Sequence, residues 1–352
     1  MTAELAWYLV LCFFSFFYCF LNKRTPFVIV TYGIALFYLW IVRNSGFDYD
    51  MAGYAKYLSS TLDFATASTY YTREFVYWFG SGYLYEWIRD DVTTLWVIDL
   101  IWLSLLFYAV GNRKQSLRIP LYVAPFMLVF FPVLMGYENV YRQIIACMFI
   151  LYAFFGVRNL FMAGIFGLLA LFTHNASIVY MPLLYLFAVT KGMTMPKLSF
   201  FHKSIFSFLY VLMLGGVYYS SLADSELAKS SSTTGLPLTY AYLMVFIAMS
   251  FIAFMIANFN FKRFLQNNIS LAYAIFTFVA FIPALGGAQA ERIGMMLLVV
   301  IVPIFAMNLD RAMKTQSERL LMRILFVLVG IAPTFLFSSA FNFLTTASRQ
   351  IG

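Results

Sequence analysis

The sequence predicts an all-α, polytopic membrane protein, and three observations support this prediction. Of 352 residues, 63% are hydrophobic and 11% charged, and the mean hydropathy is +0.83. That much apolar surface exceeds what a soluble core can bury. The apolar runs are long and uniform rather than alternating, which favours helices over a barrel, because backbone groups in lipid must be bonded within their own segment. Without a visible internal repeat, residues 1–352 are expected to form a single integral membrane domain.

About twelve apolar stretches approach the ~20 residues that a helix needs to cross the hydrocarbon core, although ten or eleven spans also fit the pattern. The basic pair Lys23 and Arg24 follows the first stretch instead of preceding it, so this stretch is predicted to be a retained span and not a signal peptide. The expected spans are 4–21, 27–43, 92–110, 119–136, 143–157, 160–173, 176–190, 204–222, 239–257, 269–285, 293–308 and 324–341.

Basic residues predict the orientation of these spans. Fifteen of the 23 Lys and Arg fall on one set of turns, together with only two of the fifteen acids, Asp310 and Glu318. An excess of Lys and Arg is typical of cytoplasmic loops. The net charge of +8 is thus assigned to the cytoplasmic turns, and no nucleic-acid partner is predicted. The bases are Lys23, Arg24, Arg113, Lys114, Arg118, Arg158, Lys191, Lys197, Lys203, Lys262, Arg263, Arg311, Lys314, Arg319 and Arg323.

The opposite, outer side then carries two sizeable loops, 44–91 and 223–238. Within the first loop, residues 75–88 are apolar but too short for an ordinary span, and they contain Gly80 and Gly82. If this segment crossed the bilayer, the basic turn around Lys114 would move to the outside. We therefore expect a short interfacial or re-entrant helix here.

Two arginines of the outer side open apolar helices. Arg142 precedes IIACMFILYAFF and Arg292 precedes IGMMLLVVIVP. A guanidinium offers a planar fork of donors that matches phosphate oxygens, so the pair suits a lipid-linked diphosphate. The alternative is that each side chain reaches the interface and pairs with its own neighbour, Glu138 or Glu291.

His174 ends a short apolar run and lies in the sequence THNAS. An imidazole with an ordinary pKa near ~6.5 is well suited to accept a proton from a sugar hydroxyl at neutral pH. The alternative is a hydrogen-bonded helix end. The only other histidine, His202, is predicted on the opposite side, which excludes a multi-histidine zinc site.

The stretch NSGFDYDMAGYAKYL supplies carboxylates and aromatic rings to the outer side. Asp48, Asp50 and Tyr54 could bind sugar hydroxyls and ring faces, although aromatic belts form at membrane interfaces without any ligand. A carboxylate-bound Mg²⁺ or Ca²⁺ near the two aspartates stays open. Asp99 lies two turns inside a span and is expected to be neutral or paired with an Arg or Tyr of a facing helix.

The order of short motifs along the chain resembles one family. An Arg followed by Gly-Phe-Asp-Tyr, a Glu opening an aromatic segment, Tyr-Arg-Gln, His-Asn-Ala-Ser and a late Arg-Ile-Gly occur between Arg43 and Pro303. This order resembles the EpsG-like branch of the Wzy-type polysaccharide (O-antigen) polymerases. The resemblance implies a multi-pass glycosyltransferase of the bacterial inner membrane with a periplasmic active face. Its donor and acceptor would be undecaprenyl-diphosphate-linked repeat units.

The resemblance also implies roles for residues. No cofactor or resident metal is expected, because arginines can neutralise a diphosphate leaving group without one. His174 would be the general base of an inverting transfer, with Glu74 in reserve. The diphosphate would be bound by Arg142, Arg292 and Arg43. The acceptor sugar would be bound by Asp48, Asp50, Tyr54, Glu138, Gln143 and Glu291. The family's serine is expected two positions after the His, where this chain has Ala176, so that role moves to Ser177 or is lost. Whether a chain-length regulator protein also binds stays open.

Two other functions compete with polymerisation. A membrane O-acyltransferase also uses a membrane-embedded His, but it needs a route from a cytoplasmic acyl donor and His174 is predicted to face outward. A lipid-linked glycan transporter or flippase would suit twelve spans, yet such proteins place ionisable groups near the midplane between repeats, whereas here they gather at one face.

Overall fold

A computed structural model of the protein describes residues 2–21, 27–47, 49–60, 72–111, 119–157, 159–190, 199–223, 238–283 and 287–345. All regular elements of these residues are helices, which confirms the predicted all-α class. The helices are α1 (Ala3–Cys19), α2 (Phe27–Asn44), α3 (Tyr49–Tyr57), α5 (Phe75–Ile88), α6 (Asp91–Gly111), α7 (Val123–Val129), α8 (Phe131–Glu138), α9 (Tyr141–Phe155), α10 (Leu160–Thr173), the 3-10 helix η1 (Asn175–Tyr180), α11 (Met181–Thr190), α12 (Phe200–Ala223), α13 (Leu238–Ile256), α14 (Phe261–Asn267), α15 (Ile269–Phe281), α16 (Gly287–Ala312), α17 (Gln316–Leu336) and α18 (Ser338–Thr345).

Six of the described helices are long and apolar enough to cross a membrane: α2, α6, α12, α13, α16 and α17. A seventh span forms if α14 and α15, bent by 96° to one another, count as one. Shorter apolar helices, including α1, α9 and α10, accompany them. The chain is therefore a polytopic helical membrane protein, and the number of twelve spans stays a prediction.

The predicted span 119–136 is two short helices rather than one. The chain becomes extended at Phe130, between α7 and α8, and Pro132 occupies the first turn of α8. Proline has no backbone N–H to donate, so it is tolerated in the first turn of a helix but breaks a helix interior. Every residue of both helices is buried. This apolar run therefore fills the core.

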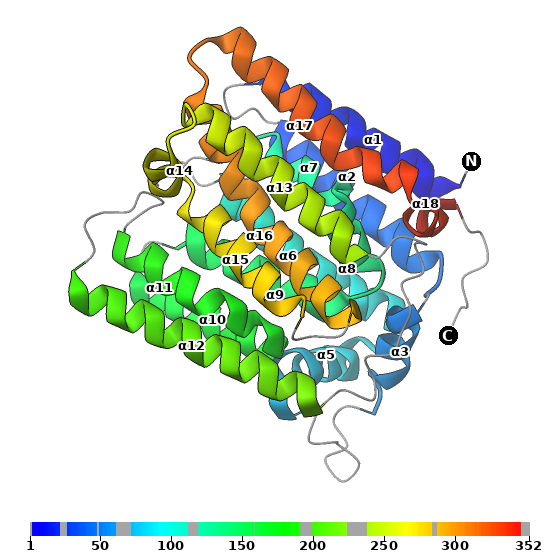
Figure 1. The fold of residues 1–352 in the computed structure, drawn as a ribbon. Helices are drawn as coiled ribbons and strands as arrows, with labels where there is room; N and C mark the ends of the chain where they lie inside the picture. The colour runs from blue at the N-terminus through cyan, green and yellow to red at the C-terminus, as the bar shows by residue number, and fades with distance from the viewer. Residues whose placement is uncertain are drawn as a thin grey trace.

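The core is centred on α16, α9 and the α7–α8 segment. α16 packs against α9, α13, α15 and α17, and 89% of its apolar window is buried. α12 packs mainly against α11 and η1, and just 11% of its window is buried. Figure 1 shows α16 in the middle of the bundle and α12 along one edge. An apolar helix this exposed fits a lipid-facing position.

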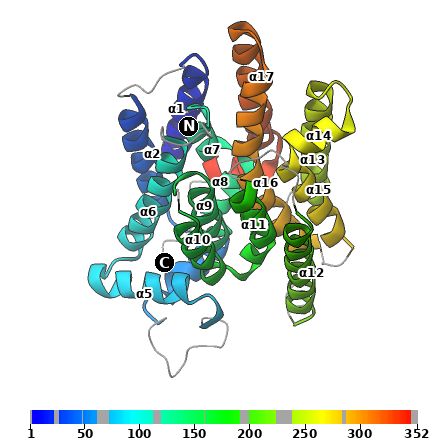
Figure 2. The same ribbon diagram turned by 90° about the vertical axis from the view of Figure 1, so that its left-hand side faces the viewer.

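The first outer loop contains a helix with the predicted bounds, α5 at Phe75–Ile88. It ends at Arg89, whose φ of 58° is left-handed. Figure 2 shows α5 lying across one end of the bundle, crosswise to α6, α9 and α10. α5 packs against α6 and α10 at this end of the bundle. Residues 61–71 of this loop and 224–237 of the second loop lie outside the described residues.

A buried ion pair joins helices elsewhere in the bundle. Arg323 of α17 donates from Nε to Asp310 of α16 at 2.5 Å and from Nη2 at 2.8 Å. Its Nη1 donates to the Cys19 carbonyl at the end of α1 at 3.0 Å. The Arg323 guanidinium thus joins α17 to the ends of α16 and α1.

Candidate functional site

The candidate site is built around the carboxylate of Glu74, which immediately precedes α5 and is 1% exposed. His174 Nδ1 lies 2.7 Å from Oε1, and the Asn175 backbone N–H donates to the same oxygen at 3.1 Å. Arg142 pairs with Oε2 through Nη1. An ionised carboxylate only accepts hydrogen bonds, so the imidazole proton must be on Nδ1. Nε2 is then the basic nitrogen of a neutral His174.

A break between helices places His174. The residue has extended backbone, with φ −155° and ψ 121°, between the end of α10 and the start of η1. Its own N–H bonds back to Ala170, whereas the first turn of η1 leaves the Asn175 N–H available for Glu74. The carboxylate thereby satisfies a donor that a helix start leaves unpaired.

Arg142 lies in the first turn of α9 and contacts three other parts of the site. In addition to the pair with Glu74, its Nε donates to Tyr54 Oη of α3 at 3.2 Å. Its guanidinium carbon lies 5.4 Å from the Tyr54 ring centroid and 5.1 Å from that of Trp78 in α5. Rings at this distance attract a cation. Arg142 therefore joins α9 to α3 and α5.

The pKa values of the dyad favour an ionised Glu74 and a neutral His174 at neutral pH. Burial alone would raise the pKa of Glu74, but His174, Arg142 and the Asn175 N–H together lower it below its ordinary value. Burial also disfavours the His174 cation, and Arg142 and Arg292 repel it. These effects outweigh the attraction of Glu74 and lower the pKa of His174.

Arg292 belongs to the same site but is held more loosely. Its Nη2 lies 3.6 Å from Asp50 Oδ2 of α3, and the two side chains are 44% and 45% exposed. An exposed pair at this separation contributes little to stability. Burial lowers the pKa of His174 most, and Arg292, like Arg142, lowers it further, so both cations act on the same imidazole. The structure thus gathers Arg142, Arg292, Glu74, His174, Asp50 and Tyr54 at one end of the bundle.

The diphosphate-binding role that the resemblance implies for Arg43 needs correction. Arg43 is 1% exposed and donates to Asp99 from Nε at 2.7 Å and Nη2 at 2.9 Å, while Nη1 donates to the Tyr137 carbonyl at 3.0 Å. Tyr141 and Trp102 donate to the same carboxylate at 2.7 and 2.8 Å. All three guanidinium nitrogens are bonded inside the protein. Asp99 was expected to be neutral or paired with an Arg or Tyr of a facing helix, and it is paired with Arg43 of α2 and Tyr141 of α9.

Of the predicted acceptor-binding residues, two are buried and a third is hydrogen-bonded within the protein. Glu138 is 3% exposed and Gln143 is 4% exposed, so neither presents its side chain to a ligand. Glu291 accepts the Leu238 N–H at 2.9 Å and connects the start of α13 to α16. Asp48 lies outside the described residues.

Sequence reasoning missed two members of the site. Trp78 stacks on Arg142, and it lies one helical turn after Glu74, which the spacing i, i+4 could have indicated. The Asn175 N–H carries no side-chain signal at all.

Within the described residues, no three His, Cys, Asp or Glu side chains lie together as metal ligands do. No family model, no curated protein and no solved structure matches this chain.

Proposed function

We propose that this protein is a membrane-embedded glycosyltransferase that polymerises undecaprenyl-diphosphate-linked repeat units into an O-antigen or related surface polysaccharide. The active face would be the periplasmic face of a bacterial inner membrane. The observation that carries the proposal is the contact of Glu74 with both His174 and Arg142, which joins a base and a phosphate-binding cation at one end of the bundle. The motif order that resembles Wzy-type polymerases supplies the substrate class.

In the proposed reaction His174 is the general base. Its Nε2 takes the proton of an acceptor hydroxyl, whose oxygen bonds to C1 of the donor's reducing-end sugar. The bond between C1 and the diphosphate oxygen breaks, its electron pair leaves with undecaprenyl diphosphate, and the configuration at C1 is inverted. Glu74 orients the imidazole and stabilises its protonated form, so it is a positioning group rather than a second base.

The two arginines would stabilise the departing diphosphate. Arg292 is half-exposed and only loosely paired, so it can bind a phosphate at little cost. Arg142 is already oriented by Tyr54, Trp78 and Glu74. Preorganised charge of this kind acts strongly where negative charge develops in the transition state. Asp50, beside Arg292 and exposed, is the acid best placed to accept hydrogen bonds from an acceptor sugar.

The test is a gel of the surface or lipid-linked glycan from the bacterium that carries this gene, after deletion and complementation. Wild type should restore a ladder, and His174→Ala should leave a single repeat unit at normal protein level. The matched control is His202→Ala, because His202 Nδ1 contacts Tyr185 at 2.8 Å, outside the Glu74 site.

Other outcomes would overturn the proposal. An intact ladder with lost acetyl groups would identify an acyltransferase. Lipid-linked units retained on the cytoplasmic side would identify a flippase. A ladder unaffected by His174→Ala would remove His174 from the reaction.

A further inference from the structure

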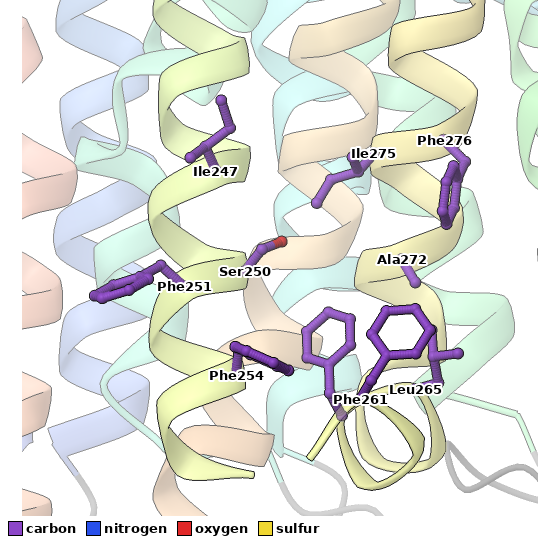
Figure 3. A pocket seen from close by; sticks show the side chains of 10 residues that line it. Ile247, Ser250, Phe251, Phe254, Phe261, Leu265, Ala272, Ile275 and Phe276 are labelled. Carbon is purple, nitrogen blue, oxygen red and sulfur yellow. The ribbon is translucent and has the colours of Figure 1, made fainter. Parts of the chain in front are cut away.

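An apolar pocket of about 440 Å³ opens between α13, α14 and α15. Figures 1 and 2 place α14 at the end of the bundle opposite α5, away from Glu74 and His174. Figure 3 shows Ile247 and Phe254 of α13, Phe261 of α14 and Ile275 of α15 around the space. Ser250 is the one polar side chain in its wall.

The backbone explains why this space stays open. α14 meets α15 at 96°, so the two cannot pack along α13 as one straight helix. The turn from α13 into α14 passes through two left-handed residues, Asn258 and Phe259, with φ of 55° and 56°. The bend carries Phe261 and Phe264 of α14 to one end of the pocket, where they line it.

The charges of α14 indicate what could occupy the pocket. Lys262 and Arg263 stand between the pocket-lining Phe261 and Phe264, and both are exposed. Among the described residues neither forms an ion pair. A short helix with aromatic residues on one face and bases on the other is typical of the interface between acyl chains and headgroups. Bases at such a position attract anionic lipid headgroups.

We propose that this pocket binds one acyl chain of an anionic phospholipid whose phosphate lies against Lys262 and Arg263. The apolar wall contacts the acyl chain, and the two bases pair with the negative charge of the headgroup. A second copy of the protein is a poorer occupant, because it would bring a chain of net charge +8 toward the same bases. The inference is independent of the proposed glycosyltransferase activity.

The test uses the full-length protein in detergent with equal amounts of dioleoyl-phosphatidylglycerol and dioleoyl-phosphatidylcholine, and native mass spectrometry counts the retained lipids. Wild type should retain phosphatidylglycerol with a preference on the order of tenfold. The variant Lys262→Ser/Arg263→Ser should lose this preference. The control Lys314→Ser/Arg319→Ser, which removes the same charge from the α16–α17 turn and the first turn of α17, should keep it.

A second variant tests the pocket itself. Ser250→Phe places a ring in the space that the acyl chain would occupy, and it should reduce retention of both lipids while the protein still elutes as a single species. Equal retention of the two lipids by wild type, or equal loss in the Lys314→Ser/Arg319→Ser control, would overturn the proposal. So would a halving of the particle mass in Ser250→Phe, which would identify the occupant as a second copy of the chain.

Discussion

The Arg43–Asp99 pair gives the sharpest quantitative prediction. Asp99 is fully buried and accepts two bonds from Arg43 and one each from Tyr141 and Trp102, all between 2.7 and 2.9 Å. Arg43→Met leaves the carboxylate with two neutral donors and no countercharge. Removing one partner of a buried pair costs about 3–5 kcal/mol of unfolding free energy.

Removing both charges together should cost less. In Arg43→Met/Asp99→Leu this charge pair is gone, and the remaining loss comes from the Tyr141 and Trp102 donors and the Tyr137 carbonyl, about 1–3 kcal/mol each at most. Those losses also occur in the single variants, so the double variant should be more stable than the sum of the single effects by about 0.5–3 kcal/mol, the coupling of residues in contact. The free energy of unfolding of wild type, Arg43→Met, Asp99→Leu and the double variant is measured in mixed micelles with increasing dodecyl sulfate.

Two results would refute this reasoning. Additive effects of the single changes would mean that Arg43 and Asp99 do not compensate one another in the folded protein. A double variant that folds but yields no polymer ladder, where wild type yields one, would return Arg43 to the diphosphate-binding role that the motif resemblance implies.

Three further predictions concern the candidate site and the packing. Arg142→Lys should shorten or abolish the ladder at normal protein level, because one ammonium does not replace a planar fork held between two rings; a normal ladder would contradict this. The transfer rate should rise with pH through a midpoint below ~6.5, because the neutral imidazole of His174 is the active form and its pKa is lowered by burial; a midpoint above that value in a pH–rate profile would exclude His174 as the base. Gly330→Ala should cost about 1–3 kcal/mol, because its Cβ would meet the ring of Phe126, which is 1% exposed and cannot move aside; the matched Gly33→Ala, with nothing within 4 Å, should be neutral or stabilising in the same unfolding assay.

Local sequence determined the helices and several of the candidate residues. Apolar runs set helix positions because backbone bonding in lipid is satisfied within each segment, and the helix at Phe75–Ile88 has the bounds that its length and flanking charges indicated. Arg142, His174 and Glu74 stood out because charged and titratable side chains are rare in so apolar a chain. Pro132 marks the start of α8, although the apolar run continues without interruption on both sides of it.

Only the tertiary structure decided which of these groups meet. Glu74 and His174 are 100 residues apart and come into contact because α5, which follows Glu74, packs against α10, which ends before His174. Arg43 matched the same motif order as Arg142, yet its partner lies on the facing helix α6, 56 residues away, so it is buried as a structural pair. Helix periodicity is local and can be read from neighbouring residues, whereas the pairing of helix faces depends on packing among segments distant in sequence, and a single chain carries no local signal for it.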